Sequence, residues 1–299
     1  MKRFISNLVI LVFLLNSCQP AASQTPGLLR ILAVESFLAD IARNVAGDRL
    51  AVESLIPVDA DPHAYQPTPQ DAAKIANADV LIINGANLEA FIAPILQNAG
   101  GKQQVISASA GLTARPDSTG DHPEGDPHFW LDPNNVIKYV ENIRDAFSQA
   151  DPAGSPVYVA NAQKYIGDLL SLDSWINSQV RNVPQAQRLL VTNHETFGYF
   201  AERYGFTIIG AIVPSITSGA APSAHELAAL INQIRSSGAP AIFLETGTNP
   251  QMADQIASET GVKVVSNLYT HSLSFPGGPA ATYIDMMKYD VTAIVEALK

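Results

Sequence analysis

SPVYVANAQKYIGDLLSLDSWINSQVRNV, residues 155–183, is the stretch that decides how this chain of 299 residues is organised. After Pro156 it contains no proline and only one glycine, Gly167. Its apolar side chains recur at intervals of three and four, which predicts one long helix of roughly seven turns; they are Ile166, Leu169, Leu170, Trp175, Ile176 and Val180. A flexible joint would be rich in Gly, Pro or polar residues. We therefore expect a rigid connection and no large hinge motion.

On both sides of this helix, short apolar runs alternate with segments of helical pattern. The expected strands are 30–34, 51–57, 80–84 and 104–107 before it, and 189–192, 207–213, 241–245 and 262–266 after it. The expected helices between and after them are 36–46, 68–78, 88–98, 196–204, 224–236, 250–259 and 280–298. This alternation is typical of parallel α/β structure. The sequence thus predicts two Rossmann-like lobes with parallel sheets, residues 29–150 and 184–299, joined by the helix at 155–183.

The N-terminal residues have the layout of an export signal. A short basic start precedes the mostly apolar run 4–15, which is shorter than the roughly 20 residues that cross a bilayer comfortably. Leu15-Asn16-Ser17-Cys18 follows and resembles the lipobox of bacterial lipoproteins, although Asn16 is not the commonest residue there. We predict a signal peptide at 1–17, a lipid anchor on Cys18, a flexible tether at 18–28 and a periplasmic or cell-surface location. The alternative is that Cys18 is discarded with the signal.

Composition narrows the possible functions. Cys18 is the single cysteine, so a mature exported protein would have no disulfide and no thiolate metal ligand. The formal charge of −10 becomes −12 when cleavage before Cys18 removes Lys2 and Arg3 and no acid. The sequence contains no basic patch, and nucleic acid is not an expected partner.

Four of the six histidines occupy similar positions relative to the expected strands. His63 lies a few residues after strand 51–57, His194 directly after 189–192, and His271 after 262–266 through a short loop. His128 follows an irregular stretch and precedes a helix that we expect to begin near Asp132. Ligands of open α/β sheets gather beyond the carboxyl ends of the strands. Two of these histidines come from each half, which predicts a metal site in the cleft between the lobes.

The chemistry of these positions favours zinc. His63 and His128 both stand in Asp-Pro-His triplets, where the proline fixes its own φ and biases its neighbour towards extended conformations. Imidazole suits Zn²⁺, and closed zinc sites have four protein ligands arranged as a tetrahedron. Any one of these histidines alone would more often have a structural or surface role. The set of four is what predicts the metal.

The motifs around these histidines resemble those of a known family. They are DPHAYQPTP, DPHFWLDP, NHETFGYFAERYGF, IFLETGTNP and YTHSLS…TYIDMMKYD. In order and spacing they resemble the metal-specific solute-binding proteins of bacterial ABC importers, the family of zinc-uptake component A and its manganese-binding relatives. The resemblance covers the chain from about Ile31 to Lys299. It implies two α/β lobes joined by a long backbone helix, with metal at their interface.

The resemblance also implies residue roles and partners. It places metal ligands at His63, His128 and His194, and it implies an importer permease with a cytoplasmic ATPase as the partners. A histidine at the third position resembles the zinc binders, whereas manganese binders tend to have glutamate there. The family usually has Asp at the fourth position, where this chain has His271.

Four neutral ligands would leave the full +2 charge on the metal, which a low-dielectric cleft penalises. A carboxylate behind the ligands is then expected, and Glu245 in FLETGTNP is the candidate. Two alternatives stay open. Glu245 could instead cap the next helix, or His271 could swing away and leave the fourth position to water or a carboxylate.

The other two histidines are not expected to bind metal. His122, in GDHPEGDPH, lies where many zinc-binding relatives carry a long His-rich insert that is nearly absent here, and we expect a solvated loop residue. His225 falls in the first turn of a capped helix and is expected to be exposed.

The sequence thus predicts an exported, lipid-anchored, monomeric receptor that binds Zn²⁺ and performs no chemistry. Receptors for Mn²⁺ or Fe²⁺ are the alternatives within this class. A zinc hydrolase is disfavoured because the chain has no HExxH helix, and because Glu195 would point away from His194. A surface adhesin is neither supported nor excluded.

Overall fold

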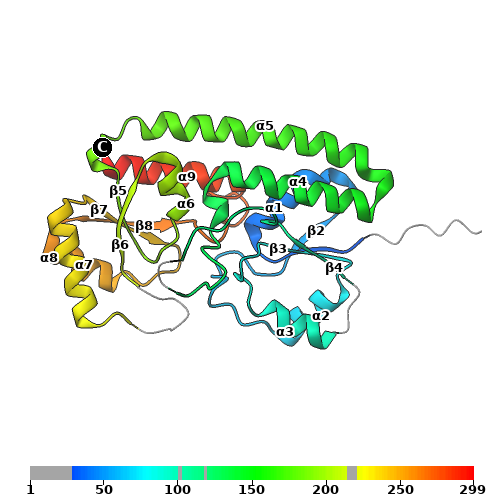
Figure 1. Ribbon diagram of the computed structural model, residues 1–299, viewed down its shortest axis with the longest axis horizontal. Coiled ribbons are helices and arrows are strands. Elements are labelled where there is room, and N and C mark those ends of the chain that lie inside the picture. The colour runs from blue at the N-terminus through cyan, green and yellow to red at the C-terminus, as the bar shows by residue number, and fades with distance from the viewer. Residues whose placement is uncertain (1–28, 100–102, 118–119, 214–220) are drawn as a thin grey trace, which may run out of the picture.

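Two four-stranded parallel sheets, one in each half of the chain, form the framework of the molecule (Figure 1). The computed structural model describes residues 29–99, 103–117, 120–213 and 221–299. The predicted signal peptide, Cys18 and the tether lie outside the described residues. The first sheet has the order β2-β1-β3-β4, built from β1 (Ile31–Ala33), β2 (Val52–Ser54), β3 (Val80–Ile83) and β4 (Gln104–Ser107).

The second sheet repeats this arrangement. Its order is β6-β5-β7-β8, built from β5 (Leu189–Thr192), β6 (Thr207–Ala211), β7 (Ala241–Glu245) and β8 (Lys263–Leu268). Every pair of neighbouring strands in both sheets is parallel. In each lobe, the loops that follow the strands therefore leave the sheet at one edge, as predicted.

Helices pack around both sheets. In the first lobe they are α1 (Ser36–Ala46), α2 (Pro69–Asn77), α3 (Ile92–Ala99) and α4 (Pro133–Ala150). In the second lobe they are α6 (Gly198–Tyr204), α7 (Ala224–Ser237), α8 (Gln251–Thr260) and α9 (Tyr283–Leu298). Thr68 before α2 and Ser223 before α7 form capping boxes.

The long helix α5 (Ser155–Val180) runs along one side of the molecule past both lobes (Figure 1). Its 26 residues span about 39 Å. On α5, Asp173 accepts hydrogen bonds from Asn134 of α4 and from Arg203 and Tyr204 of α6. The helix is therefore fastened to both lobes.

One hydrophobic core continues from the first lobe into the second. It includes Phe37 and Trp130 of the first lobe, Leu169 of α5 and Met286 of α9, all of them buried. Separating the lobes would expose this shared apolar surface, at a cost of about 25 cal/mol for each Å². This shared core is a packing reason to expect the rigid connection that the composition of residues 155–183 predicts.

The observed boundaries depart from the expected ones where the backbone turns. Helix α5 ends at Val180 rather than at residue 183. Helix α3 begins at Ile92 rather than at residue 88, and residues 88–91 form turns instead of its first helical turn. Gly85, Ala86 and Asn87, just before them, are left-handed, with φ values of 98°, 50° and 60°. None of the described helices is both long and apolar enough to cross a membrane.

Candidate metal centre

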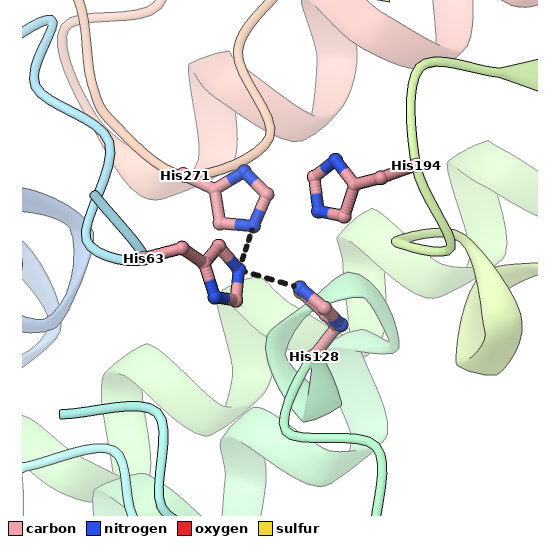
Figure 2. Close-up of side chains that lie close together, drawn as sticks. All are labelled: His63, His128, His194 and His271. Carbon is pink, nitrogen blue, oxygen red and sulfur yellow. Dashed lines mark hydrogen bonds between the residues drawn. The ribbon is translucent and has the colours of Figure 1, made fainter. Parts of the chain in front are cut away.

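His63, His128, His194 and His271 come together between the two lobes. One ring nitrogen from each can be chosen so that all four lie within 4.8 Å of one another. His63 Nε2 is 3.2 Å from His128 Nε2 and 3.2 Å from His271 Nε2. Figure 2 shows the four rings turned towards a common point, each arriving on its own segment of the chain.

The two Asp-Pro-His triplets use one local structure. In the first, the backbone N–H of His63 donates to Asp61 Oδ1 at 2.8 Å, and in the second that of His128 donates to Asp126 Oδ1 at 3.0 Å. An aspartate that accepts from the residue two positions later stabilises a tight turn. The sequence interpretation credited the proline alone. The aspartate contributes as well, and its fixed spacing from the histidine could have revealed it.

The other two histidines are placed by strand ends of the second lobe. His194 follows β5 with one residue between them, and His271 follows β8 after Tyr269 and Thr270. Both rings are buried, at 4% and 6% exposed. The structure therefore does not show the alternative in which His271 swings away from the centre.

A carboxylate lies behind three of the four rings. Asp126 Oδ1 is 2.8 Å from His128 Nδ1. Glu245 reaches two rings at once, with Oε1 at 3.1 Å from His194 Nδ1 and Oε2 at 3.2 Å from His271 Nδ1. Carboxylates in such positions orient imidazoles for metal binding and raise their basicity.

Glu245 was expected either to support the ligands or to cap the next helix. The contacts favour the first role, because α8 begins only at Gln251 and has no side-chain cap. Burial raises the pKa of Glu245, but the charges of His194 and His271 outweigh it and hold that pKa well below its usual range. Thr196, which the sequence interpretation missed, donates its hydroxyl to Glu245 Oε1 at 3.0 Å and lies 2.7 Å from His194 Nε2.

The pKa of His194 is shifted in the opposite direction from those of His63 and His128. Burial and the neighbouring histidines lower the pKa of His63 and of His128 well below its usual value. Burial also acts to lower the pKa of His194, but the Glu245 carboxylate outweighs it and leaves that pKa raised. At neutral pH, His63 and His128 are therefore neutral, which is the form that binds metal.

The expectation that His122 is a solvated loop residue is wrong. Its side chain is buried, at 7% exposed, and its ring centroid lies 5.3 Å from that of His63. The loop folds against the centre because its backbone is tied down: the His122 N–H donates to Asp117 Oδ2, and the Asp126 N–H donates to the Arg115 carbonyl. His225 is exposed on α7, as predicted.

Two cavities lined by both lobes flank the histidines. One, of roughly 480 Å³, is bordered by Asp59, Asp61, Glu245 and His271. The other, of roughly 300 Å³, is bordered by Arg115, Asp121, His122, His128, His194 and Glu195. Acidic side chains line both, so both favour a cation over an anion.

Two α/β lobes that share one hydrophobic core, with four imidazoles meeting at their interface, define a metal-binding receptor of the two-lobed solute-binding class. The chain belongs to the family described as zinc-uptake complex component A, periplasmic, whose model matches residues 31–297. Members of this family are extracytoplasmic solute-binding receptors of ABC importers rather than enzymes. The predicted family, fold class and location outside the cytoplasm are confirmed.

The relatives differ in the metal for which they are named. The chain is 34% identical over 303 residues to the manganese-binding lipoprotein MntA of Halalkalibacterium halodurans, covering 100% of this chain and 99% of that one. It is 33% identical to the iron-binding protein YfeA of Yersinia pestis, covering 92% of this chain and 88% of that one. Family membership therefore leaves the metal undetermined.

Solved structures share the whole architecture. The Mn-bound periplasmic metal binding protein of Candidatus Liberibacter asiaticus is 33% identical, with a TM-score of 0.81 over 91% of this chain and 100% of that one. The periplasmic zinc binding protein TroA of Treponema pallidum is 24% identical, with a TM-score of 0.82 over 91% of this chain and 99% of that one. At that identity, TroA supports the fold alone.

Proposed function

We propose that this chain is a zinc receptor, which binds Zn²⁺ through His63, His128, His194 and His271 and delivers it to the permease of an ABC importer driven by a cytoplasmic ATPase. The observation that carries the proposal is the donor set: four imidazoles converge, and the nearest carboxylates lie behind them. Nitrogen-rich sites suit zinc, whereas Mn²⁺ is better served by carboxylate, carbonyl and water oxygens.

The spacing of the ring nitrogens supports a tetrahedral ion. Zinc–nitrogen bonds of about 2.0–2.1 Å in a tetrahedron place neighbouring nitrogens about 3.3–3.4 Å apart. The separations of 3.2 Å from His63 Nε2 to His128 Nε2 and to His271 Nε2 already have nearly this length. Four protein ligands fill the shell, which leaves no open position for a reactive water and supports transport rather than hydrolysis.

The charge balance supports the same proposal. Four neutral imidazoles leave +2 on the ion, and one Glu245 carboxylate in contact with two of the rings reduces the net charge to about +1. Asp126 behind His128 lowers it further when ionised; burial raises the pKa of Asp126 to about 7. The negative charge attracts the cation without supplying an oxygen ligand.

A manganese or iron receptor is the second candidate. The relatives named for manganese and iron binding favour it. A carboxylate oxygen of Glu245 that displaced one imidazole would create the mixed shell that such ions prefer. Both candidates include lipidation at Cys18, anchoring of a monomer to the membrane and a permease as the partner. The relatives named as lipoproteins support the anchor.

Metal competition separates the two candidates. The protein is stripped with a chelator and titrated with Zn²⁺, Mn²⁺ and Fe²⁺ under anaerobic conditions, alone and in competition. We expect one zinc per chain, bound more tightly than manganese or iron. His128→Ala should abolish tight binding, while His225→Ala, which removes an exposed histidine, should leave it unchanged. Tighter binding of manganese than of zinc would refute the zinc assignment and leave the receptor class standing.

A further inference from the structure

The indole ring of Trp130 packs against two of the proposed ligands. Its side chain is fully buried, in the short helical turn Phe129–Leu131 that follows His128. Its ring centroid is 5.3 Å from that of His128 and 5.6 Å from that of His271. The centroids of these two imidazoles are themselves 5.1 Å apart. One side chain of the first lobe thus contacts a histidine of each lobe.

Trp130 is also hydrogen-bonded to the second lobe at two points. The indole N–H donates to the carbonyl of Thr270 at 2.7 Å, and the carbonyl of Trp130 accepts from the Tyr283 hydroxyl at 2.6 Å. Thr270 is the residue directly before His271. Both bonds are buried, where a polar group left unpaired is costly. The segment that carries His271 is therefore held close to the segment that carries His128.

The neighbours of Trp130 hold this arrangement in place. The indole stacks on Phe37 of α1, with ring centroids 4.4 Å apart and an angle of 25° between the ring planes. On the other segment, Asp290 of α9 accepts from the Tyr269 N–H at 2.8 Å, one residue before Thr270. Buried side chains are close-packed, so a shift of the indole would have to move its neighbours as well. The spacing of the two imidazoles is thus fixed from both lobes.

A fixed spacing bears on which ion the centre accepts. Zn²⁺ is satisfied by four ligands in a tetrahedron, whereas Mn²⁺ favours octahedral shells of oxygen. Such a shell would need the rings to separate and to admit water or a Glu245 oxygen. We propose that Trp130 is a positioning residue that keeps the imidazoles of His128 and His271 at tetrahedral spacing and so closes the shell to oxygen ligands. This inference rests on the proposed zinc site.

Trp130→Phe tests this role, because phenylalanine keeps an aromatic ring but removes the N–H donor and part of the ring area. Zinc binding should weaken by about tenfold, as for other residues that orient metal ligands, while manganese binding should hold or strengthen. The ratio of zinc to manganese affinity, measured by competition with a chelator, should therefore fall by about tenfold or more. The visible absorption of the Co²⁺-loaded protein should lose intensity as the coordination number rises above four. Trp175→Phe is the matched control, since Trp175 is the other tryptophan and lies on α5, and it should match the wild type in both measurements.

A role in packing alone would lower the Tm of the metal-free Trp130→Phe protein but leave the affinity ratio and the cobalt spectrum unchanged, and that result would overturn the proposal. If Trp130→Phe does not fold, Trp130 is replaced in the Trp175→Phe background by β-(3-benzothienyl)alanine, which keeps the shape of indole and has sulfur in place of the N–H group. The ratio should again fall, and an unchanged ratio would count against the proposal in the same way. A wild-type protein that binds manganese more tightly than zinc contradicts the zinc receptor, whereas a zinc preference that Trp130→Phe leaves intact contradicts only this inference.

Discussion

Replacing Glu245 by glutamine tests the contribution of one buried carboxylate to metal binding. The side chain of Glu245 is 11% exposed and contacts the Nδ1 atoms of both His194 and His271. Glutamine keeps the size and one carbonyl oxygen, which can accept from one Nδ1–H group, but its amide nitrogen is a donor and cannot accept from the second, and the negative charge is lost. The Glu245→Gln variant should therefore fold normally but hold only one of the two rings as the wild type does.

The expected magnitude follows from the distance to the ion. The Glu245 contact to His271 Nδ1 is 3.2 Å; crossing the ring and adding a Zn–N bond of about 2.0 Å places the ion about 6 Å from the carboxylate. A −1 charge at that distance from a +2 ion attracts it by about 5.5 kcal/mol at an effective dielectric constant of about 20. This is an upper bound, because the carboxylate already stabilises His194 in the metal-free protein. Carboxylates behind ligating histidines typically contribute 10–100-fold in metal affinity, about 1.4–2.7 kcal/mol.

We therefore expect Glu245→Gln to weaken zinc binding by about 10–100-fold, measured by competition with a chelator of known affinity. Glu259→Gln is the matched control, since Glu259 is an exposed glutamate of the same lobe, and it should bind zinc as the wild type does. Glu245→Ala should be at least as weak as Glu245→Gln. Wild-type affinity in Glu245→Gln would refute the reasoning that a buried four-imidazole site depends on this charge.

Three further predictions concern the ligand His271, the pH dependence of zinc binding and the buried Glu35. His271→Asp should raise the affinity for Mn²⁺ relative to Zn²⁺ by about tenfold or more, because it adds an oxygen ligand; unchanged affinity and preference in calorimetry would contradict a four-histidine shell. Zinc affinity should begin to fall at a pH above the ordinary histidine pKa of about 6.5 as the pH drops, because the raised pKa of His194 lets protons compete there first; equal affinity at pH 7.5 and 5.5 would contradict this. Glu35→Gln should stabilise the protein at pH 8 and not at pH 4, because burial and Glu89 raise the pKa of Glu35 well above its usual range. The folded state then loses up to about 1.4 kcal/mol of stability per pH unit above the unfolded pKa of about 4.3. Thermal unfolding of both proteins at the two pH values measures this difference in stability.

The fold was predictable because its signals are local. Apolar runs of strand length and a proline-free helical stretch each depend on a few neighbouring residues, and the structure has strands and the long helix α5 at these places. The boundaries that moved depend on backbone conformation. The residue types at 88–91 do not show that these residues form turns, and α3 therefore begins later than expected.

The candidate site was predictable only where strand ends specify it. His194 and His271 follow strands directly, and parallel topology then brings such positions together. His122 has no such anchor, because its burial depends on how a loop lies against both lobes. Composition and periodicity do not encode that contact. The spacing between Asp126 and His128 was visible, but a short Asp-Pro-His motif says nothing about a second contact between the two side chains.

The packing between the lobes bears on how a bound ion would leave the centre. A receptor that binds a cation tightly must also release it, and many two-lobed proteins could do so by opening. Here a shared hydrophobic core and the contacts of Asp173 on α5 oppose that motion. We therefore expect release to begin at the ligands rather than by separation of the lobes. His63 is the partly exposed member of the set and is the ligand expected to leave first, while Glu245 keeps His194 and His271 aligned.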